Sequence, residues 1–196
     1  MTRILKKPEI RKQEIVDTAM IIFNEKGYDA TSIADIAKAM GIVPSLCYRY
    51  FSSKQEIFEI AVKEYAKESS KDFIKIIQDR TKSFKERLDI FGLTMINKEE
   101  NSKYHDFFHT KGNETFHLQL SIEMFKYLSP FICKELNELN KTTEIQVEDT
   151  ELVTNFILYG QLSLWLTPQY NIRNKPVEEE LKQIRGYIYK LLNVKE

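Results

Sequence analysis

The sequence contains few of the residues that interrupt regular structure or cross-link a chain. Only 6 glycines and 5 prolines occur among 196 residues, and this scarcity favours long helices over many turns. The two cysteines, Cys47 and Cys133, belong to no CxxC pair, and one disulfide would be a thin framework for a secreted protein. These counts predict a reduced, cytoplasmic protein built from helices.

The sequence also lacks long apolar segments and an excess of either charge. No stretch reaches the roughly 18 apolar residues of a membrane span, and no amino-terminal apolar run precedes a small-residue cleavage site. Lys plus Arg and Asp plus Glu both number 29, so total charge indicates no particular partner. Residues 1–12 have a local net charge of +4, which is typical of polyanion-binding arms and also of tails that only aid solubility.

Apolar residues recur at helical spacing along most of the chain, and no segment shows a convincing strand pattern. Hydrophobic residues make up 42% of the chain, which is enough for a sizeable core. Pro130 predicts a break between two helices, and the polar segment 141–148 predicts a loop. We therefore predict an all-α fold with helices over residues 8–26, 33–40, 44–50, 54–73 and beyond, 84–97, 103–110, 114–129, 131–140, 149–167 and 176–193.

Residues 33–52 have the spacing of two short helices joined by a tight turn. Ala37 is small where the helices would cross, and Gly41 tolerates the positive φ that the turn needs. Ser32 and Asp35 have the form of a capping box. This spacing is that of a helix-turn-helix, whose second helix enters the DNA major groove. An ordinary helical corner with its rings in the core is the alternative. The apolar residues available to fill the angle are Ile36, Met40, Ile42, Cys47 and Tyr50.

A helix-turn-helix assigns particular contacts to the residues of its second helix. Arginine is the commonest reader of guanine in the major groove, and Arg49 stands where it would face base edges. Contacts to phosphate position a protein without specifying sequence. The predicted groove-facing residues are Pro44, Ser45, Leu46 and Arg49, and the predicted phosphate contacts are Thr31, Ser32, Tyr48, Tyr50 and Lys54.

The run from Ile15 to Phe58 resembles the DNA-binding domain of the TetR family of transcriptional regulators. The resemblance rests on Ile15, Ala19 and Phe23, on GYDATSI at 27–33, DIA at 35–37 and MGI at 40–42, and on YRYFSSKQEIF at 48–58. It implies a helix-turn-helix three-helix domain over 1–53 and a larger helical ligand-binding and dimerisation domain over 54–196. The sequence departs from the family at Val43, Leu46 and Cys47, where serine, threonine and leucine are usual.

The resemblance also implies an apolar effector site in the second domain. Rings are frequent in segment 104–131, and at helical spacing such a set is more often core than ligand pocket. Read against the family, part of it lines a cavity for a small hydrophobic effector that shifts the fourth helix. The residues we expect to line it are Phe91, Met95, Phe108, Phe116, Leu120, Met124, Phe156 and Trp165.

The two carboxy-terminal helices, 149–167 and 176–193, carry broad apolar stripes. Gly160 and Ser163 would let another helix approach closely, so two copies of the chain could form a four-helix interface. Alternatively, these helices cover the core of their own domain. We favour a homodimer, because a palindromic operator requires a protein with two-fold symmetry.

Other candidate sites are weaker. His105, His109 and His117 lie close in sequence but without the HExxH pattern, so we expect no metal. Cys47 is expected to be a buried small hydrophobe rather than a redox switch. No phosphate loop or nucleophile elbow is present, and we expect no catalytic residue and no cofactor. The sequence thus predicts a ligand-responsive transcriptional regulator, most simply a repressor. The alternative is a helical ligand-binding protein or enzyme that has lost DNA binding.

Overall fold

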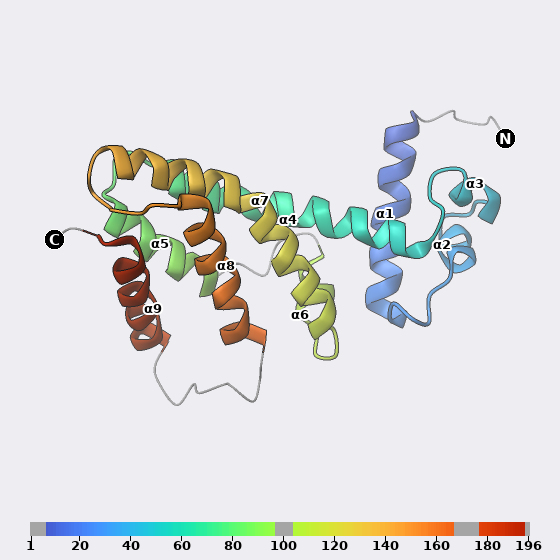
Figure 1. Ribbon diagram of the computed structural model, residues 1–196. Helices are drawn as coiled ribbons and strands as arrows, with labels where there is room; N and C mark the ends of the chain where they lie inside the picture. Colours follow the sequence, from blue (N-terminus) through green and yellow to red (C-terminus); the bar gives the residue numbers. More distant parts are fainter. Residues whose placement is uncertain (1–6, 97–103, 167–176, 195–196) are drawn as a thin grey trace. The chain divides into compact units, whose positions relative to one another are not determined.

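The computed structural model describes residues 7–96, 104–166 and 177–194. Within these ranges the chain forms nine α-helices and no strand, as the periodicity predicts (Figure 1). None of these helices is long and apolar enough to cross a lipid bilayer. The helices are α1 (Pro8–Lys26), α2 (Ile33–Ala39), α3 (Pro44–Tyr48), α4 (Lys54–Gln78), α5 (Phe84–Ile96), α6 (His105–His109), α7 (Glu114–Lys141), α8 (Thr150–Leu166) and α9 (Val177–Leu192).

The chain divides into two compact units. The first unit comprises residues 1–65 and 101–117, and the second comprises 66–100 and 118–196. Helices α4 and α7 therefore each begin in the first unit and end in the second. The packing groups α6, the start of α4 and the start of α7 with the segment 1–53 that the sequence assigns to DNA binding.

The core of the first unit is formed by the apolar stripes of its helices. From α1, Ile15 and Ala19 are fully buried, and Ile36 and Ala37 are fully buried on α2. Ile57 and Ala61 add the inner face of α4, and Cys47 the inner face of α3. The burial of these residues at helical spacing ties the first helix to the helix-turn-helix and sets the angle at which α3 is presented.

The core of the second unit joins α7, α9 and the segment that follows α7. Ile145 is fully buried, although it lies in the polar segment 141–148, and the N–H of Gln146 donates to the carbonyl of Leu192 at 2.9 Å. The predicted loop is therefore held against α9 rather than free in solvent. Its buried cluster consists of Leu136, Leu139, Ile145, Ile188 and Leu192.

The predicted helix break at Pro130 is wrong, because α7 runs through it from Glu114 to Lys141. A proline inside a helix removes one N–H donor and crowds the preceding turn, which normally ends or kinks the helix. The turns on both sides are anchored by burial of Leu128 and Leu136, while Pro130 itself is exposed. Tertiary packing of the flanking turns outweighs the local cost of the proline.

Candidate nucleic-acid interface and ligand cavity

Capping interactions fix the end of α1 and the beginning of α2. Helix α1 ends at Gly27, which has a φ of +86° and donates its N–H to the Phe23 carbonyl at 2.9 Å. At the start of α2, the Ser32 hydroxyl accepts the N–H of Asp35, and the Asp35 carboxylate accepts the N–H of Ser32 at 2.9 Å. The predicted capping box is confirmed. Hydrogen bonds from Ser32, and then from Lys26, lower the pKa of Asp35 to about 2.

The turn from α2 to α3 is a Schellman motif. The N–H of Ile42 donates to the Ala37 carbonyl at 3.0 Å, and the N–H of Gly41 donates to the Lys38 carbonyl at 3.1 Å. Gly41 has a φ of +64°, a conformation that costs glycine no steric strain. The glycine thus ends α2 and redirects the chain, so that α3 begins three residues later at Pro44.

Helix α3 has one buried side and one exposed side. Val43 precedes it without a side-chain capping bond, and Pro44 at the first position needs no donor satisfied. Cys47 is fully buried and anchors the inner side. Pro44, Ser45, Tyr48 and Arg49 are exposed, whereas Leu46 and Tyr50 are half-buried. Of the predicted groove-facing residues, Pro44, Ser45 and Arg49 are therefore exposed, and Leu46 is only partly so.

Two predicted phosphate contacts are engaged within the protein instead. Thr31 is only 3% exposed, and its hydroxyl donates to the Gly27 carbonyl at 2.8 Å. The Lys54 ammonium donates to the carbonyls of Tyr28 (2.6 Å), Asp29 (3.1 Å) and Thr31 (2.9 Å). It also lies 4.4 Å from the centre of the Tyr28 ring. Both side chains hold the loop between α1 and α2.

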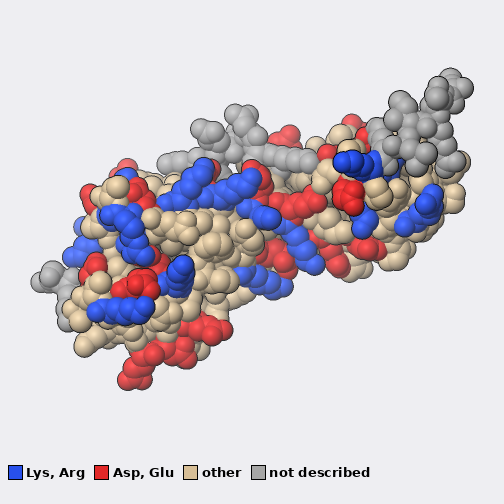
Figure 2. Space-filling model, turned by 90° about the horizontal axis from the view of Figure 1, so that it is seen from above, with Lys and Arg blue, Asp and Glu red and all other residues tan. Residues whose placement is uncertain are grey.

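Charge on the face that Figure 2 presents is mixed rather than separated by sign. Figure 2 shows Lys and Arg side chains interspersed with Asp and Glu over the face that it presents. This agrees with the equal numbers of basic and acidic residues. Affinity for a polyanion would therefore come from particular positions, and exposed Arg49, the residue that caps the carboxy-terminal end of α3, is one of them.

An aromatic cluster fills the first unit where α6 and the start of α7 pack. Phe58 of α4 lies at its centre, with its ring 5.8 Å from Phe107 and 5.0 Å from Phe116. Phe108 stacks on Tyr65 at 5.1 Å. Phe108 and Phe116, both predicted to bind ligand, thus lie in this cluster rather than in the cavity described next. The hydroxyl of Tyr104 donates to Asp17, and burial raises the pKa of Tyr104.

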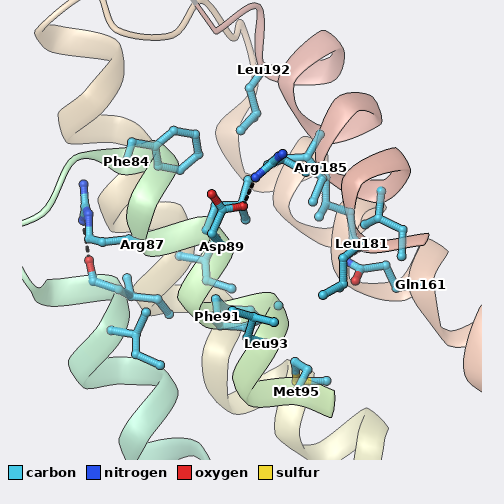
Figure 3. Close-up of a pocket in the computed structure, with 18 of the residues that line it drawn as sticks. Phe84, Arg87, Asp89, Phe91, Leu93, Met95, Gln161, Leu181, Arg185 and Leu192 are labelled. Atoms are coloured by element: carbon cyan, nitrogen blue, oxygen red, sulfur yellow. Dashed lines mark hydrogen bonds and ion pairs between the residues drawn. The ribbon is translucent and has the colours of Figure 1, made fainter. Parts of the chain in front are cut away.

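The second unit contains a cavity of about 470 Å³, a size suited to a small organic ligand (Figure 3). Residues of α4, α5, α7, α8 and α9 line it, and most of them are apolar. Phe91 and Met95, which the sequence assigned to the ligand site, are in its wall. Gly92 is where α5 approaches α9, because a Cβ there would lie 3.2 Å from Leu181.

The other residues predicted to bind ligand lie elsewhere. Leu120 and Met124 are buried on α7 but outside the cavity lining found among the described residues. Phe156 is 64% exposed on α8. The side chain of Trp165 lies outside the described residues. An apolar or aromatic side chain can lie in a core, in a cavity wall or on an exposed helix face. Which of these it occupies depends on tertiary contacts.

Sequence reasoning missed the buried charges of the cavity wall, Arg87 and Glu135. Arg87 is 6% exposed and Glu135 is 7% exposed, and Arg87 Nη1 lies 2.7 Å from Glu135 Oε1. The sequence feature that could have revealed this pair is Glu135, which follows Leu128 by seven residues and precedes Leu136, both of them buried. A carboxylate on an apolar helix face requires a buried partner.

The histidines lie together but show no metal site. The rings of His105 and His109 stack with centres 4.1 Å apart, and His109 and His117 are 4.9 Å apart. Among the described residues, no group of His, Cys, Asp and Glu is arranged to hold a metal ion. Burial raises the pKa of the fully buried Cys47, which supports its packing role over redox chemistry.

The amino-acid sequence is similar to those of known bacterial regulatory proteins. The family model described as "Bacterial regulatory proteins, tetR family" matches residues 15–61. The chain is 27% identical over 187 residues to the biofilm operon icaADBC HTH-type negative transcriptional regulator IcaR of Staphylococcus aureus (strain Newman), covering 93% of this chain and 97% of the relative.

Solved structures share the whole fold. A putative TetR-family transcriptional regulator from Mesorhizobium loti MAFF303099 superposes with a TM-score of 0.64 at 16% identity, covering 96% of this chain and 98% of the other. The structure of RolR in complex with the ligand resorcinol superposes with a TM-score of 0.63 at 15% identity, covering 96% of this chain and 90% of the other.

Proposed function

Because the chain belongs to the TetR family of bacterial transcriptional regulators, we propose that it acts as a homodimeric repressor that an apolar effector releases from its operator. TetR-type regulators bind operator DNA and small molecules. Our proposal further specifies the residues that contact DNA, the dimer interface, the class of effector and the sign of regulation. Such a protein would act in the cytoplasm, where bacterial DNA lies.

The exposed side of α3 is the observation that carries the DNA-binding proposal. Pro44, Ser45, Tyr48 and Arg49 are exposed together, while Cys47 on the opposite side is fully buried. A short helix held rigidly by one face and bare on the other is suited to enter the major groove. Arg49 would read a base edge, and Tyr48 and Ser32 would contact phosphates.

Repression is proposed from the likeness to IcaR, which is a negative transcriptional regulator similar along 93% of this chain. A repressor blocks transcription while it occupies its operator, and loss of binding relieves the block. Two copies of α3 would have to enter successive major grooves, which lie about 34–36 Å apart.

A dimer through α8 and α9 is supported by large apolar side chains that both helices expose. On α8, Leu152 and Phe156 are 67% and 64% exposed, and Tyr159 continues the same face. On α9, Tyr187 is 65% exposed and Leu191 is 42% exposed. Large apolar side chains exposed along a helix face are costly in water and mark interaction sites.

The cavity of the second unit is the proposed effector site. Helix α4 contributes Ile57 and Phe58 to the core of the first unit, and the same helix contributes Ile76 and Ile77 to the cavity wall in the second. An effector that binds two positions of α4 unequally would shift the population between them. The RolR structure, which holds resorcinol, supports a small aromatic or otherwise apolar occupant.

The proposal is tested by changing the exposed residues of α3. Arg49→Ala should weaken binding to an operator, selected from random duplexes, by about 1–3 kcal/mol, and relax the choice of base at one position. Tyr48→Ala should weaken binding to all sequences. An electrophoretic shift assay measures both, and circular dichroism checks that helix content is retained.

Arg49→Lys is the matched control, because it keeps the charge but loses bidentate hydrogen bonding. It should retain non-specific binding and lose base selectivity. Unchanged operator affinity in both alanine variants would refute this interface. It would favour the alternative of a helical ligand-binding protein without DNA-binding activity.

A further inference from the structure

Val43 is exposed directly before α3. Its exposed fraction is 63%, the largest of any large apolar side chain among the described residues of the first unit. Pro44 and Ser45, the next two residues, are exposed as well, whereas Leu46 is half-buried and Cys47 is fully buried. Val43 and Pro44 together thus form an apolar tip at the start of α3.

Valine is a poor residue for the position that it occupies here. Its φ of −81° and ψ of 143° are extended, and its carbonyl accepts the N–H of Leu46 at 2.9 Å, so Val43 is the N-cap of α3. The side chain of an N-cap residue normally accepts a hydrogen bond from an N–H of the first turn, and serine, threonine, aspartate and asparagine can do so. Valine has no acceptor, and α3 accordingly has no side-chain cap.

Two local costs therefore coincide at Val43. An exposed valine forgoes the free energy that burial of its side chain would give, and a valine at an N-cap leaves the first turn without a side-chain acceptor. A single exposed apolar residue is ordinary on a protein surface. A residue that is unfavourable both for its exposure and for its helix position is expected where a binding partner compensates.

The place of the apolar tip indicates which partner compensates. The first residues of a recognition helix are those that reach base edges in the major groove. Those edges carry hydrogen-bonding groups, and the apolar group among them is the 5-methyl group of thymine. The side chains of Val43 and Pro44 have no hydrogen-bond donor or acceptor. They are therefore suited to select thymine over cytosine by contact with that methyl group.

We propose that Val43 is a specificity-determining residue, which together with Pro44 packs against the 5-methyl group of a thymine in each half of the operator. This inference rests on the proposed function and deepens it, because it adds a base contact to the one assigned to Arg49. Arg49 reads a hydrogen-bonding edge, whereas the apolar tip reads a methyl group. The two residues thus specify base pairs by different chemistry.

Removal of single methyl groups from the operator tests this contact. Deoxyuridine pairs as thymidine does but lacks the 5-methyl group, so each thymidine of an operator selected from random duplexes is replaced in turn. Binding of the full chain is measured by fluorescence anisotropy. At one thymine position in each half-site, the replacement should weaken binding about fivefold, as expected for one buried methyl group. At the same position, 5-methylcytosine paired with guanine should bind more tightly than cytosine.

Val43→Ser tests the residue, because it removes the apolar contact and supplies the missing cap. The variant should bind the thymidine and deoxyuridine duplexes equally at that position. Its urea midpoint of unfolding should rise, because the serine hydroxyl can accept an N–H of the first turn. Damage to the fold would lower that midpoint, so the two readouts distinguish lost recognition from lost structure. Ile21→Ser is the matched control, since Ile21 is 58% exposed on α1, and it should keep the preference for thymidine.

The outcomes separate this inference from the proposed function. If the protein binds its operator but no deoxyuridine replacement weakens binding, DNA recognition stands and the methyl contact fails. The same conclusion follows if Val43→Ser keeps the full preference for thymidine at every position. If the protein selects no operator from random duplexes, the proposed function fails and the inference fails with it.

Discussion

The Lys54 ammonium group has three N–H donors, and three backbone carbonyl oxygens surround it. The carbonyls belong to Tyr28, Asp29 and Thr31 in the loop between α1 and α2. A lysine near a recognition helix suggests a phosphate contact, but this one fastens the loop to the start of α4. At the scale of single residues, neighbouring backbone atoms decide the use of such a side chain.

Lys54→Met should therefore lower stability more than it lowers DNA affinity. Loss of charged hydrogen bonds to the loop is expected to cost about 1–3 kcal/mol of unfolding free energy. Urea denaturation monitored by circular dichroism measures it. Lys63→Met, an exposed position on the same helix, is the matched control and should change stability little.

The opposite result would support the prediction that Lys54 contacts a DNA phosphate. If Lys54→Met kept its stability but weakened binding to all duplexes equally, with a salt dependence shallower by about one counterion, the side chain would be acting on DNA.

Asp35 predicts a pH dependence of stability. Its folded-state pKa is about 2, below the ordinary value of 3.8, because Ser32 and Lys26 donate hydrogen bonds to the ionised carboxylate. As pH falls, the unfolded chain takes up its proton first. The stabilisation from Asp35 is therefore complete above pH 3.8 and is lost as the pH falls toward about 2.

Asp35→Asn should lower the urea midpoint at neutral pH, and the difference from the wild type should shrink across that acidic interval. Unfolding curves at stepped pH values measure it. Asp106→Asn, at an exposed carboxylate of α6, is the control for the loss of one surface carboxylate. A difference that stayed constant down to the lowest pH would contradict the assignment.

At the scale of elements, α7 shows packing prevailing over local propensity. The buried residues Leu128, Leu136 and Leu139 flank an exposed proline and keep the helix continuous. A substitution that restores the missing N–H donor should then release a cost that the fold now bears.

Pro130→Ala is expected to raise the unfolding free energy, by up to about 3 kcal/mol. Because Pro130 is exposed, removing its ring leaves no cavity. Thermal and urea unfolding measure the gain, with Lys134→Ala on the same helix as a near-neutral control. A loss of stability would show instead that the packing of α7 depends on the shape that the proline imposes.

At the scale of the whole molecule, the proposed dimer gives α3 its function, because one short helix covers only half of a palindromic site. The large exposed side chains of α8 and α9 are the part of the surface that a partner copy would cover. Charge at that surface should separate the subunits without disturbing either unit.

Phe156→Glu, alone or with Tyr187→Glu, should convert the protein to a monomer in sedimentation velocity and weaken operator binding at least about tenfold, because both half-sites are then bound independently. Ile21→Glu supplies the control, since Ile21 is 58% exposed on α1, a helix that is no part of the proposed interface. If the protein remained a dimer with both charged substitutions, the dimer interface would have to lie elsewhere on the surface.

Much of the first unit could be predicted from the sequence because its signals are local. The capping box joins residues three apart, the Schellman turn at Gly41 joins residues five apart or fewer, and the apolar stripe repeats within one helix. Such interactions form wherever the chain goes next, so the residues alone determine these helices and their turns, whereas packing against α2 decides which face of α3 is exposed.

Only the tertiary structure decided which of several similar side chains lie in the cavity wall and which lie in a core. Phe91 and Phe108 have the same chemistry, yet one lines the cavity and the other stacks in the first unit. Arg87 and Glu135 meet across 48 residues of chain, and their pairing puts a buried ion pair in the cavity wall. Contacts between distant segments depend on how helices pack, and no pattern within a helix carries that information.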